Sequence, residues 1–134
     1  MNSHPSTLRA SRRGFSMVEM IACVSIIGII AFLAIPSITR MRSDSERNLA
    51  ISRAESLNLA MATYIQVAGR SQAANEWTSA TNAQAKYEKI RPYLAYAETT
   101  LTAYMPQDYG ITFPVSITSM TKASLTGPSG NIPY

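Results

Sequence analysis

The chain has 134 residues with a formal net charge of +4, and it holds one cysteine and one histidine. This length leaves room for one long helix and one small domain, and it excludes two independently folded domains. Three of the twelve basic residues lie in residues 1–14, so the remaining chain holds nine basic against eight acidic residues, and this near balance gives no support to a nucleic-acid-binding protein.

Residues 1–14 form a polar, basic segment that contains Arg9, Arg12 and Arg13. It is not a secretory signal of the usual kind, because the apolar block that follows lacks a small-residue cleavage site. Basic residues beside an apolar segment stay on the cytoplasmic side of a membrane. We therefore predict that residues 1–14 are a cytoplasmic leader peptide.

The segment from Phe15 to Ile35 is apolar, with Glu19 as its only charged side chain. As a helix it would be about 30 Å long, which matches the hydrocarbon core of a bilayer. In lipid its backbone polar groups must be paired within the segment, which favours a helix. A buried helix of a soluble protein is the alternative, but a chain this short would struggle to cover a helix that is apolar on every face. We predict a transmembrane helix over residues 15–36.

Glu19 is the unusual residue in this segment. A carboxylate costs about 2.5–3.5 kcal/mol at the centre of a membrane helix and less near an end. The start of the helix offers free N–H groups and the positive end of the helix dipole. If the chain were cut after Gly14, the new amine of Phe15 would lie four residues from Glu19 and would be a positively charged partner for its carboxylate.

The chain reads Gly14-Phe15-Ser16-Met17-Val18-Glu19, and its apolar stretch ends Ala34-Ile35-Pro36. This pattern resembles the class III signal of type IV prepilins and type II secretion pseudopilins. In that family a membrane-embedded prepilin peptidase cuts after the glycine, and the new N-terminal residue is methylated. The resemblance implies cleavage between Gly14 and Phe15 and N-methylation of Phe15. It also implies a contact between Glu19 and the N-terminal amine of a neighbouring subunit during assembly.

Pro36 matches the family's proline at the end of the first apolar block. Proline removes a backbone donor, so we expect a loosened or kinked helix there. The run from Ser43 to Glu46 has the pattern of a capping box, at which a helix could restart. Ile38 and Met41 keep helical spacing across this region, so we favour one continuous helix.

Residues 37–69 are predicted to be an amphipathic continuation of the helix. Apolar residues recur there at steps of three and four, which predicts one buried face, and Gly69 signals the C-terminus. The predicted buried face consists of Ala50, Ala54, Leu57, Met61, Tyr64, Ile65 and Ala68.

Residues 70–134 are predicted to form a small head domain. Residues 70–82 are polar and are expected to be a loop that Trp77 anchors to the head. Thr81 or Asn82 is expected to cap a short helix that ends at Ile90, and Pro92 either stops this helix or starts a further turn. Tyrosine side chains are expected to pack the head with their hydroxyls at its surface; these are Tyr87, Tyr93, Tyr96 and Tyr104.

The C-terminal part alternates between apolar and polar side chains, which predicts a strand over residues 111–118. Pro114 lies on its outward side and indicates an edge strand or a bulge. Residues 123–126 are expected to return as a second strand, followed by an extended tail. A small antiparallel sheet packed on the amphipathic helix gives an α+β, pilin-like fold.

Catalytic, cofactor and metal sites are not predicted. The chain has no phosphate-binding glycine loop and no paired carboxylates at a useful spacing, and Cys23 has no partner for an intrachain disulfide. The acidic residues of the head are spaced unlike those of a calcium loop; they are Glu76, Glu88, Glu98 and Asp108.

These features favour a structural subunit of a type IV pilus or a type II secretion pseudopilus. Its expected partners are prepilin peptidase, other pilin or pseudopilin subunits, an inner-membrane assembly platform and the lipid bilayer. Its expected location is the bacterial inner membrane, which it crosses once, with the C-terminal head in the periplasm or on the cell surface. The alternative is a single-pass anchored binding domain that does not polymerise, but that explains neither Glu19 nor the Gly14–Phe15 junction. A membrane-tethered enzyme has no residues in its favour.

Overall fold

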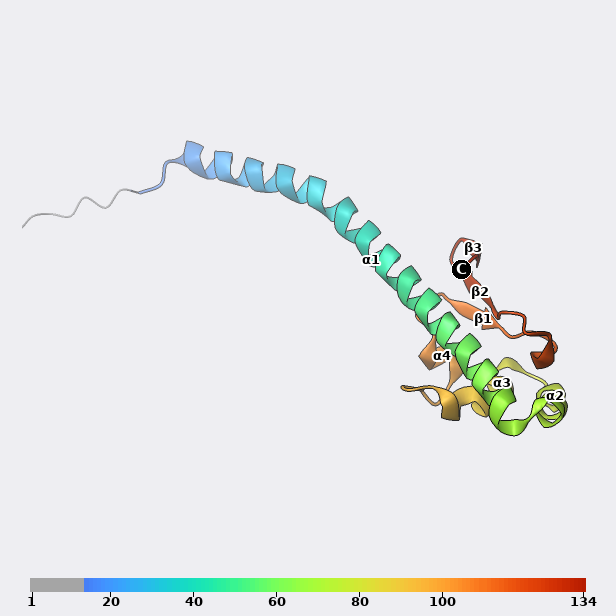
Figure 1. The fold of residues 1–134 in the computed structure, drawn as a ribbon. Helices are drawn as coiled ribbons and strands as arrows, with labels where there is room; N and C mark the ends of the chain where they lie inside the picture. The colour runs from blue at the N-terminus through green and yellow to red at the C-terminus, as the bar shows by residue number, and fades with distance from the viewer. Residues whose placement is uncertain (1–13) are drawn as a thin grey trace, which may run out of the picture. The chain divides into compact units, whose positions relative to one another are not determined.

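The computed structural model describes residues 14–134, so the predicted leader lies outside the described residues except for Gly14. The described chain divides into two units, the first ending at Arg40 and the second spanning Met41–Tyr134. The elements in chain order are α1 (Met17–Ala68), α2 (Arg70–Ser79), α3 (Ala83–Ile90), the 3₁₀ helix η1 (Arg91–Tyr93), α4 (Leu101–Tyr104), β1 (Gly110–Thr112), the 3₁₀ helix η2 (Ile117–Ser119), β2 (Ser124–Gly127) and β3 (Gly130–Ile132) (Figure 1). The predicted α+β, pilin-like fold is confirmed.

In the first unit α1 begins at Met17 and continues through Pro36. The favoured continuous helix is therefore correct, and α1 does not restart at Ser43. The large apolar side chains of this part of α1 are exposed, as illustrated by Phe32 at 79% and Ile27 at 65%. A patch of this kind on a protein marks a surface for lipid or for other proteins.

In the second unit one face of α1 forms part of the core. The predicted stripe is confirmed, because Ile65 and Ala68 pack against the core and the buried residues of α1 are Ala50, Ala54, Leu57, Ala60, Met61 and Tyr64. The helix ends at Ala68, as Gly69 predicted. Gly69 has a φ of 83°, a left-handed conformation that glycine adopts without a steric penalty.

The loop predicted for residues 70–82 is wrong, because α2 fills most of this segment. Gly69 turns the chain and a new helix starts at once. Ala73 and Trp77, four residues apart and so on one face of α2, are both fully buried. The indole N–H of Trp77 donates to the Pro114 carbonyl at 2.9 Å, and its ring meets Phe113 edge-on at 5.6 Å. The anchoring role predicted for Trp77 is thus confirmed, but a helix provides it.

The short helix α3 agrees closely with its prediction. The side chain of Asn82 accepts a hydrogen bond from the Ala85 amide at 2.7 Å, so Asn82 is the N-cap. Tyr87 and Ile90 are fully buried. Pro92 lies inside η1 and so belongs to a further turn, which was one of the two options.

The sheet of the second unit is antiparallel and has the order β1-β2-β3. Leu125 of β2 pairs with Ile111 on one side and with Ile132 on the other. The predicted strand over residues 111–118 is too long, because β1 ends at Thr112 and Ile117 belongs to η2. Val115, expected on the buried face, is 90% exposed. The carbonyl of Pro114 accepts from Trp77 and Lys86, so the chain there bonds to helices and leaves the sheet.

The tyrosines of the second unit divide into three kinds. Tyr87 and Tyr104 are buried, as predicted, while Tyr93 is partly buried against the core. The hydroxyl of Tyr87 donates to the Glu98 carbonyl at 2.7 Å. Tyr96 is 93% exposed, so the expectation that it packs in the head is wrong. It lies in the irregular segment between η1 and α4, where no helix or strand holds its backbone against the core.

Candidate processing and assembly site

Gly14 and Phe15 precede the first helical residue. Both are exposed and neither belongs to a helix or strand, and Phe15 is 84% exposed. The peptide bond between them is therefore outside α1. A Cβ added to Gly14 would meet no atom within 4 Å. The described chain therefore has no packing reason for a glycine at this position, and a requirement for one would have to come from a protein that binds it.

Ser16 and Glu19 form a capping box at the start of α1. The backbone N–H of Ser16 donates to the Glu19 carboxylate at 2.8 Å, and the backbone N–H of Glu19 donates to the Ser16 hydroxyl at 3.2 Å. This exchange pairs N–H groups that a helix start otherwise leaves free. Sequence reasoning missed Ser16, although a Ser-x-x-Glu run directly before an apolar segment is the signal for such a cap.

The capping box brings the Glu19 carboxylate next to residue 15. Its hydrogen-bond donor is the amide that joins Phe15 to Ser16, so the carboxylate already lies beside the backbone of the predicted new N-terminus. An ammonium group on Phe15 would be one residue away from this amide. Of the predicted site residues, Glu19 is thus held beside the backbone that follows Phe15, while Gly14 is near it only through its position in the sequence.

Pro36 lies farther along α1, apart from the other three residues. Its ring nitrogen has no hydrogen, so the helix lacks one i to i−4 bond there. The carbonyl without this partner is that of Phe32. The hydroxyl of Thr39 donates to the carbonyls of Ile35 at 3.3 Å and Pro36 at 3.0 Å, one turn further along α1. A kink at Pro36 remains a prediction.

Residues 9–35 match the family described as the prokaryotic N-terminal methylation motif. The chain carries the prepilin-type signal of type IV pilins and pseudopilins. The matched segment contains Gly14, Phe15 and Glu19 and ends one residue before Pro36. No curated protein and no solved structure matches the chain.

The prepilin-type signal gives the apolar part of α1 a biological context. This helix is long and apolar enough to cross a membrane, and none of its most apolar stretch is buried within the protein. Signal and helix together fit membrane anchoring. The signal also implies processing by prepilin peptidase and assembly with other pilin subunits, and it suggests a structural protein.

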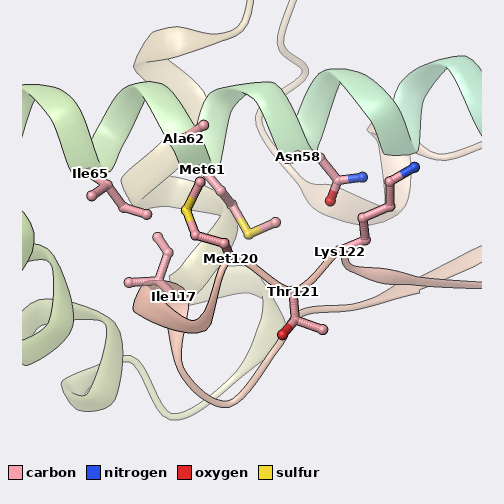
Figure 2. Close-up of a pocket in the computed structure, with 8 residues that line it drawn as sticks. All are labelled: Asn58, Met61, Ala62, Ile65, Ile117, Met120, Thr121 and Lys122. Carbon is pink, nitrogen blue, oxygen red and sulfur yellow. The ribbon is translucent and has the colours of Figure 1, made fainter.

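One cavity of the second unit, between α1 and the segment after η2, is too small for a small-molecule ligand. The cavity in Figure 2 lies between α1 and the segment after η2, with the side chains of Met61 and Met120 directed into it. Its volume is about 60 Å³, far below the roughly 300–1,000 Å³ of typical ligand pockets. Within residues 14–134, no group of three or more His, Cys, Asp or Glu side chains could hold a metal ion.

Proposed function

We propose that the protein is a structural subunit of a type IV pilus or a type II secretion pseudopilus. Prepilin peptidase cuts it between Gly14 and Phe15, the Phe15 amine is methylated, and the helix polymerises from the inner membrane. The observation that carries this proposal is the prepilin-type signal over residues 9–35. It is supported by the apolar side chains of α1 in the first unit, which the described chain leaves exposed.

The assembly step is a change of surroundings for the apolar helix. In the bilayer its side chains contact lipid, and in a filament they contact the same helix of other subunits, so they remain apart from water in both states. Head-to-tail contacts build an open helical filament when the rotation between subunits does not close a ring. The inner-membrane assembly platform is the proposed place of this transfer, with the head in the periplasm or outside the cell.

Glu19 has the proposed role of aligning neighbouring subunits. In the unprocessed chain its carboxylate is held by the Ser16 amide. After cleavage, the Phe15 amine of an adjacent subunit competes for the same carboxylate. A carboxylate binds an ammonium group more strongly than it binds a neutral amide N–H, above all in surroundings of low dielectric constant. A subunit placed out of register would leave this charge unpaired, which is strongly unfavourable.

Mass spectrometry of the native protein tests this proposal. We expect a mature chain that begins with N-methylated Phe15. A native chain that keeps Met1 would contradict it and would favour the single-pass anchored domain. Coexpression with a prepilin peptidase adds a genetic test, in which Gly14→Val blocks cleavage and leaves the band unshifted on a gel.

Gly28→Val is the matched control for this test. Gly28 is an exposed glycine of the apolar segment that follows Gly14, and a Cβ there also meets no atom within 4 Å. We expect the Gly28 variant to be cut as the wild type is. Equal loss of cleavage in both variants would argue against recognition of the Gly14–Phe15 junction.

A further inference from the structure

We infer that a groove beside the first turns of α1 in the second unit binds the phosphate group of an anionic phospholipid. The groove has a volume of about 330 Å³ and is lined by Ser43 and Arg47 of α1, by Tyr109 and by residues 128–133. Its lining offers hydrogen-bond donors from an arginine, a tyrosine, two serines and an asparagine, and no acidic side chain. A site of this composition favours an anion with several oxygen acceptors.

The charge of Arg47 is free to bind such an anion. The ion pairs of the described residues are Arg42–Glu46, Lys89–Glu76 and Lys122–Glu55, so none of them includes Arg47. Its side chain is exposed at the groove. The guanidinium group is planar and donates two parallel hydrogen bonds, a geometry that matches two phosphate oxygens.

The opposite wall of the groove is built by close packing around the β2–β3 turn. A Cβ on Gly127 would lie 2.8 Å from the Ile132 side chain and 2.9 Å from the Tyr109 ring. Only glycine therefore allows both of these lining side chains to pack against the turn. Gly130, paired with Gly127, has a φ of 109°, which lets the chain reverse and present Ser129 and Asn131. The wall is thus formed before any ligand arrives, which reduces the entropy lost on binding.

A phospholipid is the source of phosphate that the sequence favours. Ser43 and Arg47 belong to the same helix as the apolar segment and lie eight and twelve residues after Ile35, with Arg40 and Arg42 between Ile35 and Ser43. Phosphate groups lie just outside the hydrocarbon core of a bilayer, and basic side chains near a membrane surface attract anionic lipids. This inference rests on the membrane anchoring in the proposed function, and not on polymerisation.

The test uses the full chain in detergent micelles, labelled for amide NMR. It is titrated with short-chain phosphatidylglycerol, short-chain phosphatidylcholine, glycerol phosphate and inorganic phosphate. We expect phosphatidylglycerol to shift the amides of Tyr109, Ser129 and Asn131 with the lowest apparent Kd of the four. Arg47→Gln should raise that Kd at least about tenfold, because it removes hydrogen bonds to a charged group.

Arg91→Gln is the control, because it removes one positive charge from a site outside the groove. It should leave the Kd unchanged, and the unshifted spectrum of each variant shows that the head is folded. Equal binding of both lipids, or no effect of Arg47→Gln, would overturn the inference. Equally tight binding of inorganic phosphate would show that the groove recognises free phosphate and not a lipid. If the same amides shift as the protein concentration rises without lipid, the lipid inference is wrong. The groove then binds an acidic group of a second copy of the chain.

The outcome is separate from that of the proposed function. If the native chain begins with methylated Phe15 but phosphatidylglycerol does not bind at Arg47, only the lipid site is refuted. If the native chain keeps Met1 and still binds phosphatidylglycerol, the filament role is refuted and the lipid site is supported.

Discussion

The backbone amide of Ser16 donates a hydrogen bond to the carboxylate of Glu19, directly after the peptide bond that joins Gly14 to Phe15. This contact gives the one acidic residue of the apolar segment a partner before any processing. The same carboxylate lies one residue from the amine that cleavage would create. Glu19 can therefore serve first as a helix cap and later as an acceptor for an ammonium group.

Substitution of Glu19 separates these two roles. Glu19→Ala should insert into the membrane normally, since it makes the segment more apolar, but it should yield few or no filaments. Ser16→Ala removes only the hydroxyl half of the cap, which costs about 1 kcal/mol of helix stability, and it should still assemble. Filament yield by electron microscopy, with membrane fractionation as the check of insertion, measures both. Normal filaments from Glu19→Ala would count against the assembly role.

Trp77 is predicted to be the main support of α2. Trp77→Phe leaves a void and removes the indole donor to Pro114, so we expect a loss of about 1–3 kcal/mol in the free energy of unfolding. The control is Tyr96→Phe, because Tyr96 is 93% exposed and surface changes stay within about 0.5 kcal/mol. Urea denaturation of the full chain in detergent, followed by circular dichroism, measures both. A Trp77→Phe midpoint equal to the wild type would show that α2 contributes little.

The fold could be predicted wherever a periodic pattern was long enough. The buried face of α1 extends over several turns and was read correctly from its steps of three and four. In α2 only Ala73 and Trp77 are buried, and two apolar positions in a polar run do not make a detectable period. Strand β3 buries no residue fully, so backbone pairing with β2, rather than side-chain pattern, determines it. The length of β1 was overestimated because the alternation continues past Pro114 although the backbone bonding does not.

The candidate site at the start of α1 was predicted from a sequence motif, and its roles in cleavage, methylation and assembly stay predictions. Gly14, Phe15 and Glu19 stand at a fixed spacing in the sequence, and that spacing is independent of the tertiary fold. The runs that begin at Ser16 and at Ser43 have the same capping-box spacing, but only Ser16 stands at a helix start, because α1 is continuous through Ser43. The groove at Arg47 was not foreseen, since it depends on the close approach of Tyr109 and Gly127 in space.

Asn58 joins α1 to the chain before β2 and to the C-terminal tyrosine. Its side chain accepts from the Ala123 amide at 2.9 Å and donates to the Tyr134 hydroxyl at 3.2 Å. The Tyr134 hydroxyl in turn donates to the Ala123 carbonyl. Asn58→Ala leaves the Ala123 amide, on a buried residue, without this partner, so we expect a loss of about 1–3 kcal/mol in the free energy of unfolding.

Tyr134→Phe is the companion variant, and it should lose less, because the Ala123 amide keeps its bond to Asn58. Amide hydrogen exchange at Ala123 is the direct measurement, with faster exchange expected in Asn58→Ala and little change in Tyr134→Phe. Combining the two variants should cost less than the sum of their separate effects, since they belong to one network. Strict additivity would contradict a shared network.

The contact between Tyr64 and Glu76 is expected to make the stability of the head depend on pH. The Tyr64 hydroxyl donates to the Glu76 carboxylate at 2.5 Å. This bond, then the bond from Gln72 and, to a lesser degree, the nearby Lys89 lower the pKa of Glu76 from its usual value of 4.5, while burial acts in the opposite direction. A carboxyl group whose pKa is lower in the folded state stabilises the fold above its unfolded pKa. That stabilisation is lost as the pH falls below about 4.5 toward the folded pKa.

Burial, and then the Glu76 carboxylate, raises the pKa of the Tyr64 hydroxyl above its usual value of 10. Its contribution is present below pH 10 and is lost as the pH rises further, because the unfolded chain then releases the proton more readily. Tyr64→Phe should flatten the pH profile of the unfolding free energy on both sides, and Glu76→Gln should flatten mainly its acid side. Glu88→Gln, which also removes a carboxylate, is the control. The profile follows from urea midpoints of the full chain at acidic, neutral and alkaline pH. An unchanged acid slope in Glu76→Gln would assign the pH dependence to other carboxyl groups, such as Glu55, whose pKa the hydrogen bond from Lys122 lowers.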